Sequence, residues 1–218
     1  MPRLALLLVG VWFFALFVFR TAFQWWRTGS GGIRGFSGTL GSLERNAGLL
    51  ASLGLAAGAL APVAGLLGWP GGGLLFRFDP VHLLGAGLAA VGIAGALASQ
   101  VAMGDSWRIG VDERETTRLV TRGPFGRVRN PIFSFMLISG AGLLALVPNV
   151  FSILALGSTF AGIEIQVRAV EEPYLTKTHG SVYRAYASRV GRFLPGVGRL
   201  AAAAPTAQGT GSGRRAAS

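Results

Sequence analysis

The chain of 218 residues carries twenty Lys and Arg against nine Asp and Glu, a formal net charge of +11, yet charged residues make up only 13% of it and apolar residues 51%. Soluble domains carry roughly 25% charged residues, so this composition excludes an ordinary soluble domain and a disordered chain and indicates a polytopic membrane protein. The absence of cysteine excludes disulfides, thiolate metal sites and a cysteine nucleophile. His82 and His179 lie too far apart to suggest a metal motif, and we expect no metal site.

The chain contains five long apolar runs, and a membrane-spanning helix needs about 20 mostly apolar residues. The first run is followed by Trp25-Trp26-Arg27 rather than by a small-residue cleavage site, which favours a retained helix with interfacial anchors over a signal peptide. The second and third runs are rich in Gly and Ala, which permits close helix approach. Only residues 148–149 separate the last two runs, which indicates a helical hairpin. We predict helices at residues 4–23, 47–67, 81–103, 132–147 and 150–167.

The charges of the connecting segments predict the topology. Basic and near-neutral connections alternate, since arginines crowd the segments after the first and third helices and the C-terminal segment, whereas Arg77 and Asp79 balance each other after the second helix. The positive-inside rule then places the N-terminus outside and the C-terminus in the cytoplasm. This placement also explains the net charge without a nucleic-acid partner. The Arg-, Ala- and Gly-rich composition indicates a bacterial cytoplasmic membrane.

Residues 122–131 join the third helix to the hairpin and concentrate arginine among turn signals. Pro131 is suited to the first turn of the fourth helix, because that position needs no N–H. The free N–H groups of a helix start, with arginines beside them, can bind an anion. The alternative is a basic juxtamembrane loop that touches lipid headgroups.

Two further segments follow the hairpin. Glu164, Arg168 and Glu172 are spaced i, i+4, i+8 on one helical face, which is typical either of a functional intramembrane cluster or of a simple ion-pair ladder at the helix exit. We expect Pro173 to kink or restart the helix. Beyond it, Tyr183, Tyr186 and Val190 share a helical stripe, which also fits an amphipathic helix lying on the bilayer.

Six short motifs around the hairpin occur in a recognisable order. They are Ser-Trp-Arg-Ile-Gly (106–110), Gly-Pro-Phe (123–125), Val-Arg-Asn-Pro-Ile-Phe (128–133), Glu-Glu-Pro-Tyr-Leu (171–175), His-Gly-Ser-Val-Tyr-Arg-Ala-Tyr (179–186) and Arg-Phe-Leu-Pro (192–195). Together they make residues 106–195 resemble the isoprenylcysteine carboxyl methyltransferase/phospholipid methyltransferase family of integral membrane enzymes. Asn130 replaces a frequent histidine of that family and Phe133 its usual tyrosine. Asn130 cannot titrate near neutral pH, so we assign it no proton-transfer role.

The resemblance implies that S-adenosylmethionine binds in a cytoplasmic pocket and that a lipophilic acceptor enters it from the bilayer. Arg127 or Arg129 would hold the carboxylate of the cofactor, and Glu171 or Glu172 its amino group and ribose. The implied cofactor-binding set is Gly123, Pro124, Arg127, Val128, Arg129, Asn130, Pro131, Tyr183 and Tyr186. The residues expected on the acceptor side are Glu171, Glu172 and Arg189.

We therefore predict an all-α polytopic membrane bundle of about five transmembrane helices, including a C-terminal hairpin, plus a cytoplasmic amphipathic helix. Its parts are the N-terminal helices (1–103), a methyltransferase-like core (104–199) and a disordered tail (200–218). The expected activity is S-adenosylmethionine-dependent methyl transfer to a lipophilic acceptor. The alternatives are an NADPH-dependent, sterol-reductase-like membrane enzyme and a catalytically inactive lipid-binding protein. The sequence does not distinguish among a prenylated carboxylate, a phospholipid amine, an isoprenoid alcohol or acid, and a thiol as acceptor, and it leaves the oligomeric state open.

Overall fold

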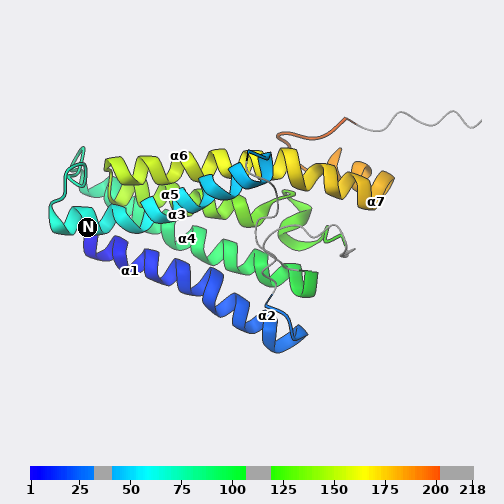
Figure 1. The fold of residues 1–218 in the computed structure, drawn as a ribbon, viewed down its shortest axis with the longest axis horizontal. Helices are drawn as coiled ribbons and strands as arrows, with labels where there is room; N and C mark the ends of the chain where they lie inside the picture. Colours follow the sequence, from blue (N-terminus) through cyan, green and yellow to red (C-terminus); the bar gives the residue numbers. More distant parts are fainter. Residues whose placement is uncertain (32–40, 107–118, 202–218) are drawn as a thin grey trace, which may run out of the picture.

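The computed structural model describes residues 1–31, 41–106 and 119–201, and over these ranges the chain forms helices and no strand. The predicted all-α membrane bundle is thus confirmed (Figure 1). Within these ranges, the helices that are long and apolar enough to cross a membrane are Pro2–Thr28, Leu43–Leu67, Asp79–Met103 and Val150–Ala187. The fourth predicted helix, α5 (Pro131–Leu146), is apolar but shorter. Most of the Ser-Trp-Arg-Ile-Gly motif and of the expected tail lies outside the described residues.

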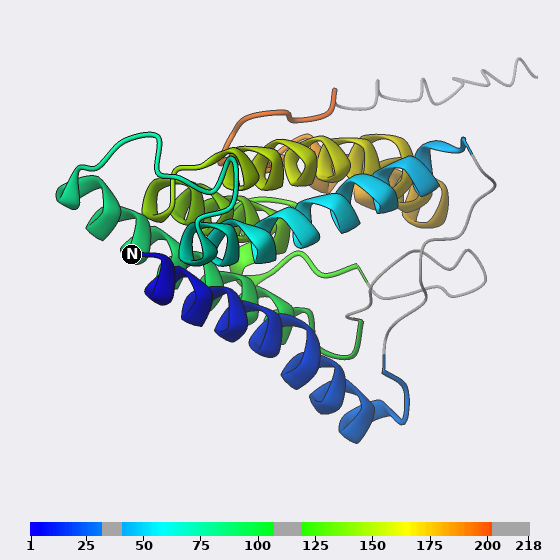
Figure 2. The same ribbon diagram turned by 60° about the vertical axis from the view of Figure 1, so that its left-hand side comes forward.

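The first membrane helix is a continuous rod built from α1 (Pro2–Phe13), the π-helical turn η1 (Phe14–Phe19) and α2 (Arg20–Thr28). It leans away from the other helices toward the α2 end (Figure 2). Arg20 is only 1% exposed, and its Nη2 donates to the carbonyl of Gly104 at 2.9 Å and to that of Gln100 at 3.4 Å. These carbonyls lie at the C-terminal end of α4 (Asp79–Met103), where the helix dipole favours a cation. Arg20 therefore anchors the leaning helix to the bundle.

Small residues bring the remaining helices into close contact in two pairs, α4 with α5 and α3 (Leu43–Leu67) with α6 (Val150–Ile165). A Cβ atom added at Gly92 would lie 2.5 Å from the backbone nitrogen of Ser139, and one at Gly142 would lie 2.3 Å from that of Ala89. Glycine is therefore required where α4 meets α5, as expected for packing through small residues in a membrane.

The turn of the predicted hairpin is fixed by buried hydrogen bonds. Asn149 is fully buried and caps α6, because its Oδ1 accepts from the backbone N–H of Ser152 at 3.0 Å. Its Nδ2 donates to the carbonyls of Ala61 at 2.8 Å and Gly72 at 3.3 Å, which ties the hairpin to the end of α3. His82 is also buried, with Nδ1 donating to the carbonyl of Ala145 at 3.1 Å. A carbonyl oxygen can only accept a hydrogen bond, so Nδ1 is a protonated nitrogen of the His82 ring. This buried bond gives His82 a structural role, because it joins α4 to Ala145 on α5.

The second arm of the hairpin does not stop at the membrane boundary. It runs from α6 through the π-helical turn η4 (Gln166–Glu171) into α7 (Glu172–Ala187). The α-helix restarts at Glu172, with Pro173 in the first turn of α7, where its missing N–H is tolerated. The backbone departs from helical geometry further on, at Gly180 (φ 53°, ψ −125°). The stripe that was expected to reach Val190 ends with the helix at Ala187.

A pair of glycine substitutions on α4 tests the close contact with α5. We expect Gly92→Ala to lower the free energy of unfolding by about 1–3 kcal/mol, because its Cβ would collide with the backbone of α5. Gly87→Ala is the matched control, since nothing lies within 4 Å of the added Cβ there. Thermal unfolding in detergent is the measurement, and equal midpoints for the two variants would contradict the packing.

Candidate active site

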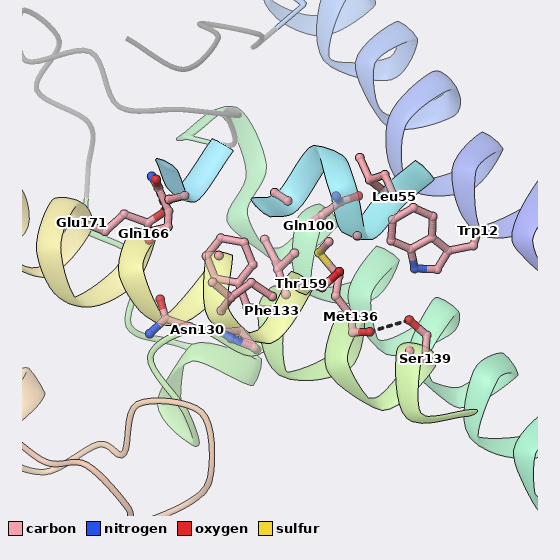
Figure 3. Close-up of a pocket in the computed structure, with 18 of the residues that line it drawn as sticks. Trp12, Leu55, Gln100, Asn130, Phe133, Met136, Ser139, Thr159, Gln166 and Glu171 are labelled. Atoms are coloured by element: carbon pink, nitrogen blue, oxygen red, sulfur yellow. Dashed lines mark hydrogen bonds between the residues drawn. The ribbon is translucent and has the colours of Figure 1, made fainter. Parts of the chain in front are cut away.

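One end of the bundle, called the loop end below, is where α4 stops, α5 starts and α7 lies (Figure 1). A cavity of about 400 Å³ opens between the helices and reaches this end. Leu8, Leu55 and Leu143 line its apolar part among the membrane helices, and Asn130, Glu171 and Tyr183 line its polar part (Figure 3). The volume falls within the roughly 300–1,000 Å³ that is usual for small-molecule sites. The cavity therefore joins a polar site to the membrane interior.

The cavity brings together part of the set of residues nominated from the sequence. Those that line it are Arg129, Asn130, Pro131, Glu171, Glu172, Tyr183 and Tyr186. Those outside its wall are Gly123, Pro124, Arg127, Val128 and Arg189. Arg127 and Arg189 are exposed, and the Nε of Arg189, just beyond α7, donates to the carbonyl of Ala185 at 3.1 Å. The structure therefore separates the arginines that the sequence treats alike.

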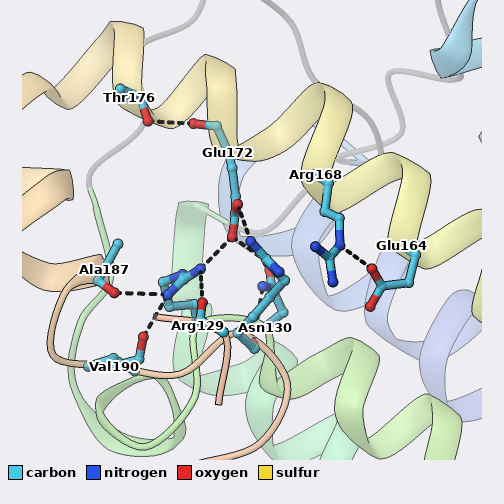
Figure 4. Close-up of polar contacts among 10 residues, drawn as sticks. Arg129, Asn130, Glu164, Arg168, Glu172, Thr176, Ala187 and Val190 are labelled. Atoms are coloured by element: carbon cyan, nitrogen blue, oxygen red, sulfur yellow. Dashed lines mark hydrogen bonds and ion pairs between the residues drawn. The ribbon is translucent and has the colours of Figure 1, made fainter. Parts of the chain in front are cut away.

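Arg129 is the most highly connected of these side chains (Figure 4). It is 6% exposed, and its Nη1 donates to the carbonyls of Ala187 at 3.0 Å and Val190 at 2.6 Å. Its Nη2 donates to the carbonyl of Gly198 at 3.1 Å and to Oε1 of Glu172 at 2.5 Å. Arg129 thus joins the segment before α5 to α7 and to the residues that follow α7.

Glu172 lies between two guanidinium groups. Its Oε1 accepts from Arg129 and from Nε of Arg192 at 2.7 Å, and its Oε2 accepts from Nη2 of Arg192 at 2.9 Å. The hydrogen bond to Glu172 raises the pKa of Arg192 above its ordinary value, which favours the charged form of this guanidinium group. One carboxylate against two guanidinium groups leaves a net charge of +1 beside the cavity. A surplus positive charge of this kind suits an anionic ligand group.

The expected ladder of Glu164, Arg168 and Glu172 forms only in part. Arg168 pairs with Glu164, but Glu172 pairs with Arg129 and Arg192 instead. The π-helical turn η4 accommodates about one residue more than an α-helical turn, which rotates Glu172 off the shared face. The i+8 spacing would place Glu172 on the same face as Glu164 only if the α-helix between them were unbroken.

Tyr183 and Tyr186 face the protein interior, with exposures of 2% and 6%. The hydroxyl of Tyr186 donates to the carbonyl of Phe125 at 2.6 Å, which ties α7 to the short 3₁₀ helix η3 (Gly123–Gly126). The neighbouring Val182 is 65% exposed. The two tyrosines therefore serve as inward packing residues rather than as anchors in the bilayer.

The polar residues of the cavity wall that the sequence reasoning missed include Trp12, Gln100 and Gln166. Trp12 Nε1 and the Oε1 atoms of both glutamines have no hydrogen-bond partner in the described part of the chain. A glutamine within an apolar membrane helix is costly unless it has a role, and this signal was available in the sequence for both glutamines.

Substitution of Arg129 tests the buried ion pair. Arg129→Ala removes one partner of Glu172 and one donor from each of the carbonyls of Ala187, Val190 and Gly198, so we expect a loss of about 3–5 kcal/mol in the free energy of unfolding. Arg127→Ala removes an exposed arginine two residues away and is expected to change it by less than about 0.5 kcal/mol. Thermal unfolding of both variants, with limited proteolysis after Ala187, provides the comparison. Equal behaviour of the variants would rule out the structural role of Arg129.

Comparison with protein families matches residues 80–182 to the phospholipid methyltransferase family. Comparisons with curated proteins and with solved structures gave no significant match. The matched segment runs from the start of α4 into α7, so it contains the hairpin, Arg129, Glu171 and Glu172. It confirms the resemblance carried by the sequence motifs and extends it to α4. Residues 80–182, somewhat less than half of the chain, are therefore similar to the phospholipid methyltransferase family, a family of membrane methyltransferases.

Proposed function

We propose that the protein is an integral membrane methyltransferase that uses S-adenosylmethionine and methylates a lipophilic acceptor. The observation that carries this proposal is the cavity, which has a polar wall at the loop end and an apolar wall between membrane helices. Most of its polar wall comes from the segment matched to the phospholipid methyltransferase family. A water-soluble cofactor and a lipid can thus reach the same space from opposite directions.

The polar wall has the donors and acceptors that S-adenosylmethionine requires. Arg129 belongs to the cluster of net charge +1, and its Nε has no hydrogen-bond partner among the described residues, so it suits the carboxylate of the methionine part. Glu171 is an acceptor for the ammonium group or the ribose hydroxyls. Tyr183 and Phe125 offer aromatic surface for the adenine. When bound, the cofactor supplies a methyl group on a positively charged sulfur.

The two neighbouring glutamates have different roles in this proposal. Glu172 is a positioning residue, because both of its oxygens are occupied by Arg129 and Arg192. Glu171 lines the cavity beside Gln166 and is the carboxylate that we assign to ligand binding or to taking a proton from the acceptor. Arg189 lies outside the cavity wall, so we give it no role in the reaction.

Methyl transfer from a sulfonium disperses charge rather than creating it, so the protein contributes mainly by positioning the reactants. The cavity does this by holding the polar groups of one reactant at the loop end while its leucines hold the tail of the other. Its apolar walls also keep water from competing with the acceptor.

We infer that the loop end faces the cytoplasm. Exposed arginines at this end include Arg27, Arg45, Arg127 and Arg184, whereas the opposite end has Arg3 and an Arg77 that is balanced by Asp79. The exposed indole rings of Trp25 and Trp26 lie at the loop end, as expected for an interfacial belt.

Single cysteines in this cysteine-free chain test the topology. We expect a membrane-impermeant maleimide added to intact cells to label Gly73→Cys, in the loop before α4, and not Ser188→Cys, just after α7. Lysed cells serve as the control in which both positions react. Labelling of Ser188→Cys in intact cells would reverse the inferred orientation.

Calorimetry with S-adenosylhomocysteine tests the cofactor, with NADPH as the competing ligand. The wild-type protein is expected to bind S-adenosylhomocysteine and not NADPH. Glu171→Gln should weaken the binding by roughly tenfold, the equivalent of about 1.4 kcal/mol. Glu164→Gln is the matched control, because its ion pair with Arg168 lies outside the cavity wall.

Two outcomes would contradict the proposal and favour its alternatives. Binding of NADPH instead would support a membrane reductase. Binding of neither ligand by protein that unfolds cooperatively would support a lipid-binding protein without catalytic activity.

A further inference from the structure

Two buried glutamines on different helices face the same cavity. Gln100 lies near the C-terminal end of α4 and Gln166 at the start of η4, and their exposures are 5% and 7% (Figure 3). Both line the cavity, and the Oε1 of each has no hydrogen-bond partner in the described structure. The polar groups assigned so far do not include Gln100.

The neighbours of the two amides determine which of their atoms remain unpaired. Nε2 of Gln100 donates to the carbonyl of Leu16 at 3.2 Å, and Nε2 of Gln166 donates to Oε1 of Glu171 at 3.4 Å. A backbone carbonyl and a carboxylate can only accept, so the atom that faces each of them must be the amide nitrogen. The atoms left without partners are therefore two oxygens, which can only accept hydrogen bonds.

Each glutamine is associated with a π-helical turn of the described chain, Gln100 by contact and Gln166 by position. Gln100 contacts Leu16 within η1, and Gln166 and Glu171 are the first and last residues of η4. π-Helical turns inside α-helices are frequently found at functional sites. The two side chains lie on opposite sides of Phe133 in Figure 3, and Phe133 itself lines the cavity.

A ligand with the correct chemistry would satisfy these oxygens. An unpaired buried amide oxygen costs about 1–3 kcal/mol, which an N–H or O–H donor recovers. An amine or a hydroxyl group provides such a donor. A carboxylate does not, and it would place its negative charge beside Glu171 and against two amide oxygens.

We propose that Gln100 and Gln166 form a subsite that binds the N–H or O–H group of the methyl acceptor and thereby selects an amine or an alcohol over a carboxylate. Trp12 complements this subsite, because it lies one helical turn before Leu16 on α1 and its Nε1–H also lacks a partner. That N–H can donate to an ester or hydroxyl oxygen of the same lipid. This inference rests on the proposed methyltransferase function.

The subsite is consistent with the balance of the reaction. Transfer to an amine or alcohol forms an N–C or O–C bond, breaks the methyl–sulfur bond and releases one proton. Glu171, which contacts Gln166, is a carboxylate that can take this proton.

Equilibrium binding of three lipids with the same tail tests the subsite, with radiolabelled hexadecylamine, hexadecanol and hexadecanoic acid as the probes. The full-length protein in detergent, with S-adenosylhomocysteine present, is expected to bind the amine or the alcohol at least tenfold more tightly than the acid. The amine and alcohol arms show which donor the site prefers. Equal or tighter binding of the acid would overturn the proposal.

Variants then assign the preference to the two glutamines. Gln100→Leu and Gln166→Leu should each weaken binding of the preferred lipid roughly tenfold or more, with little change for the acid. Ser99→Ala is the matched control, because Ser99 is buried beside Gln100 but bonds to the carbonyl of Gly95 and does not line the cavity. Unchanged lipid preference in both leucine variants would overturn the proposal.

The affinity for S-adenosylhomocysteine separates this inference from the proposed function. We expect it to stay within a few-fold of wild type in Gln100→Leu, because this glutamine faces the acceptor and not the cofactor. An equal loss of cofactor and lipid binding in Gln100→Leu would show that Gln100 serves the cofactor. A wild-type protein that selects the amine or alcohol but binds no S-adenosylhomocysteine would overturn the methyltransferase function and leave the lipid subsite standing.

Discussion

The buried contact between Glu172 and the guanidinium groups of Arg129 and Arg192 holds together the parts that build the polar wall of the cavity. It joins the segment before α5, the start of α7 and the residues after α7, which are far apart in the sequence. Ions removed from water need compensation from good geometry and from additional hydrogen bonds. The carbonyls of Ala187, Val190 and Gly198 provide those bonds for Arg129. The ion pair therefore fixes the wall, and the cavity depends on it.

The membrane part of the cavity depends on a contrast in packing. Glycines such as Gly92 and Gly142 leave no space between α4 and α5, which is the usual way to associate helices in lipid. Nearer the loop end, two π-helical turns interrupt the regular helices of the described chain. The carbonyl of Leu16 in η1 pairs with the amide of Gln100, and η4 carries Gln166 and Glu171, which line the cavity. Tight packing makes the scaffold rigid, and the irregular turns create the site within it.

Much of the fold could be predicted, because a membrane imposes long apolar runs that differ clearly from the polar segments between them. The predicted second helix, residues 47–67, corresponds to Leu43–Leu67, and the predicted third, 81–103, to Asp79–Met103. The site was predicted less completely. Sequence alone treats Arg127 and Arg129 alike, whereas burial separates them, and the partners of Glu172 lie 43 and 20 residues away. A π-helical turn has no sequence signature of its own, so the rotation of Glu172 could not be foreseen.

In the proposed function, cofactor and acceptor share one cavity that runs from the loop end into the space between the membrane helices. Photoaffinity labelling with an azido derivative of S-adenosylmethionine, followed by peptide mapping, tests it most directly. Labels on residues 125–136 and 166–186, suppressed by excess S-adenosylhomocysteine, are the predicted result. Labels confined to the lipid-facing surface of the bundle, or labelling that S-adenosylhomocysteine does not suppress, would contradict it.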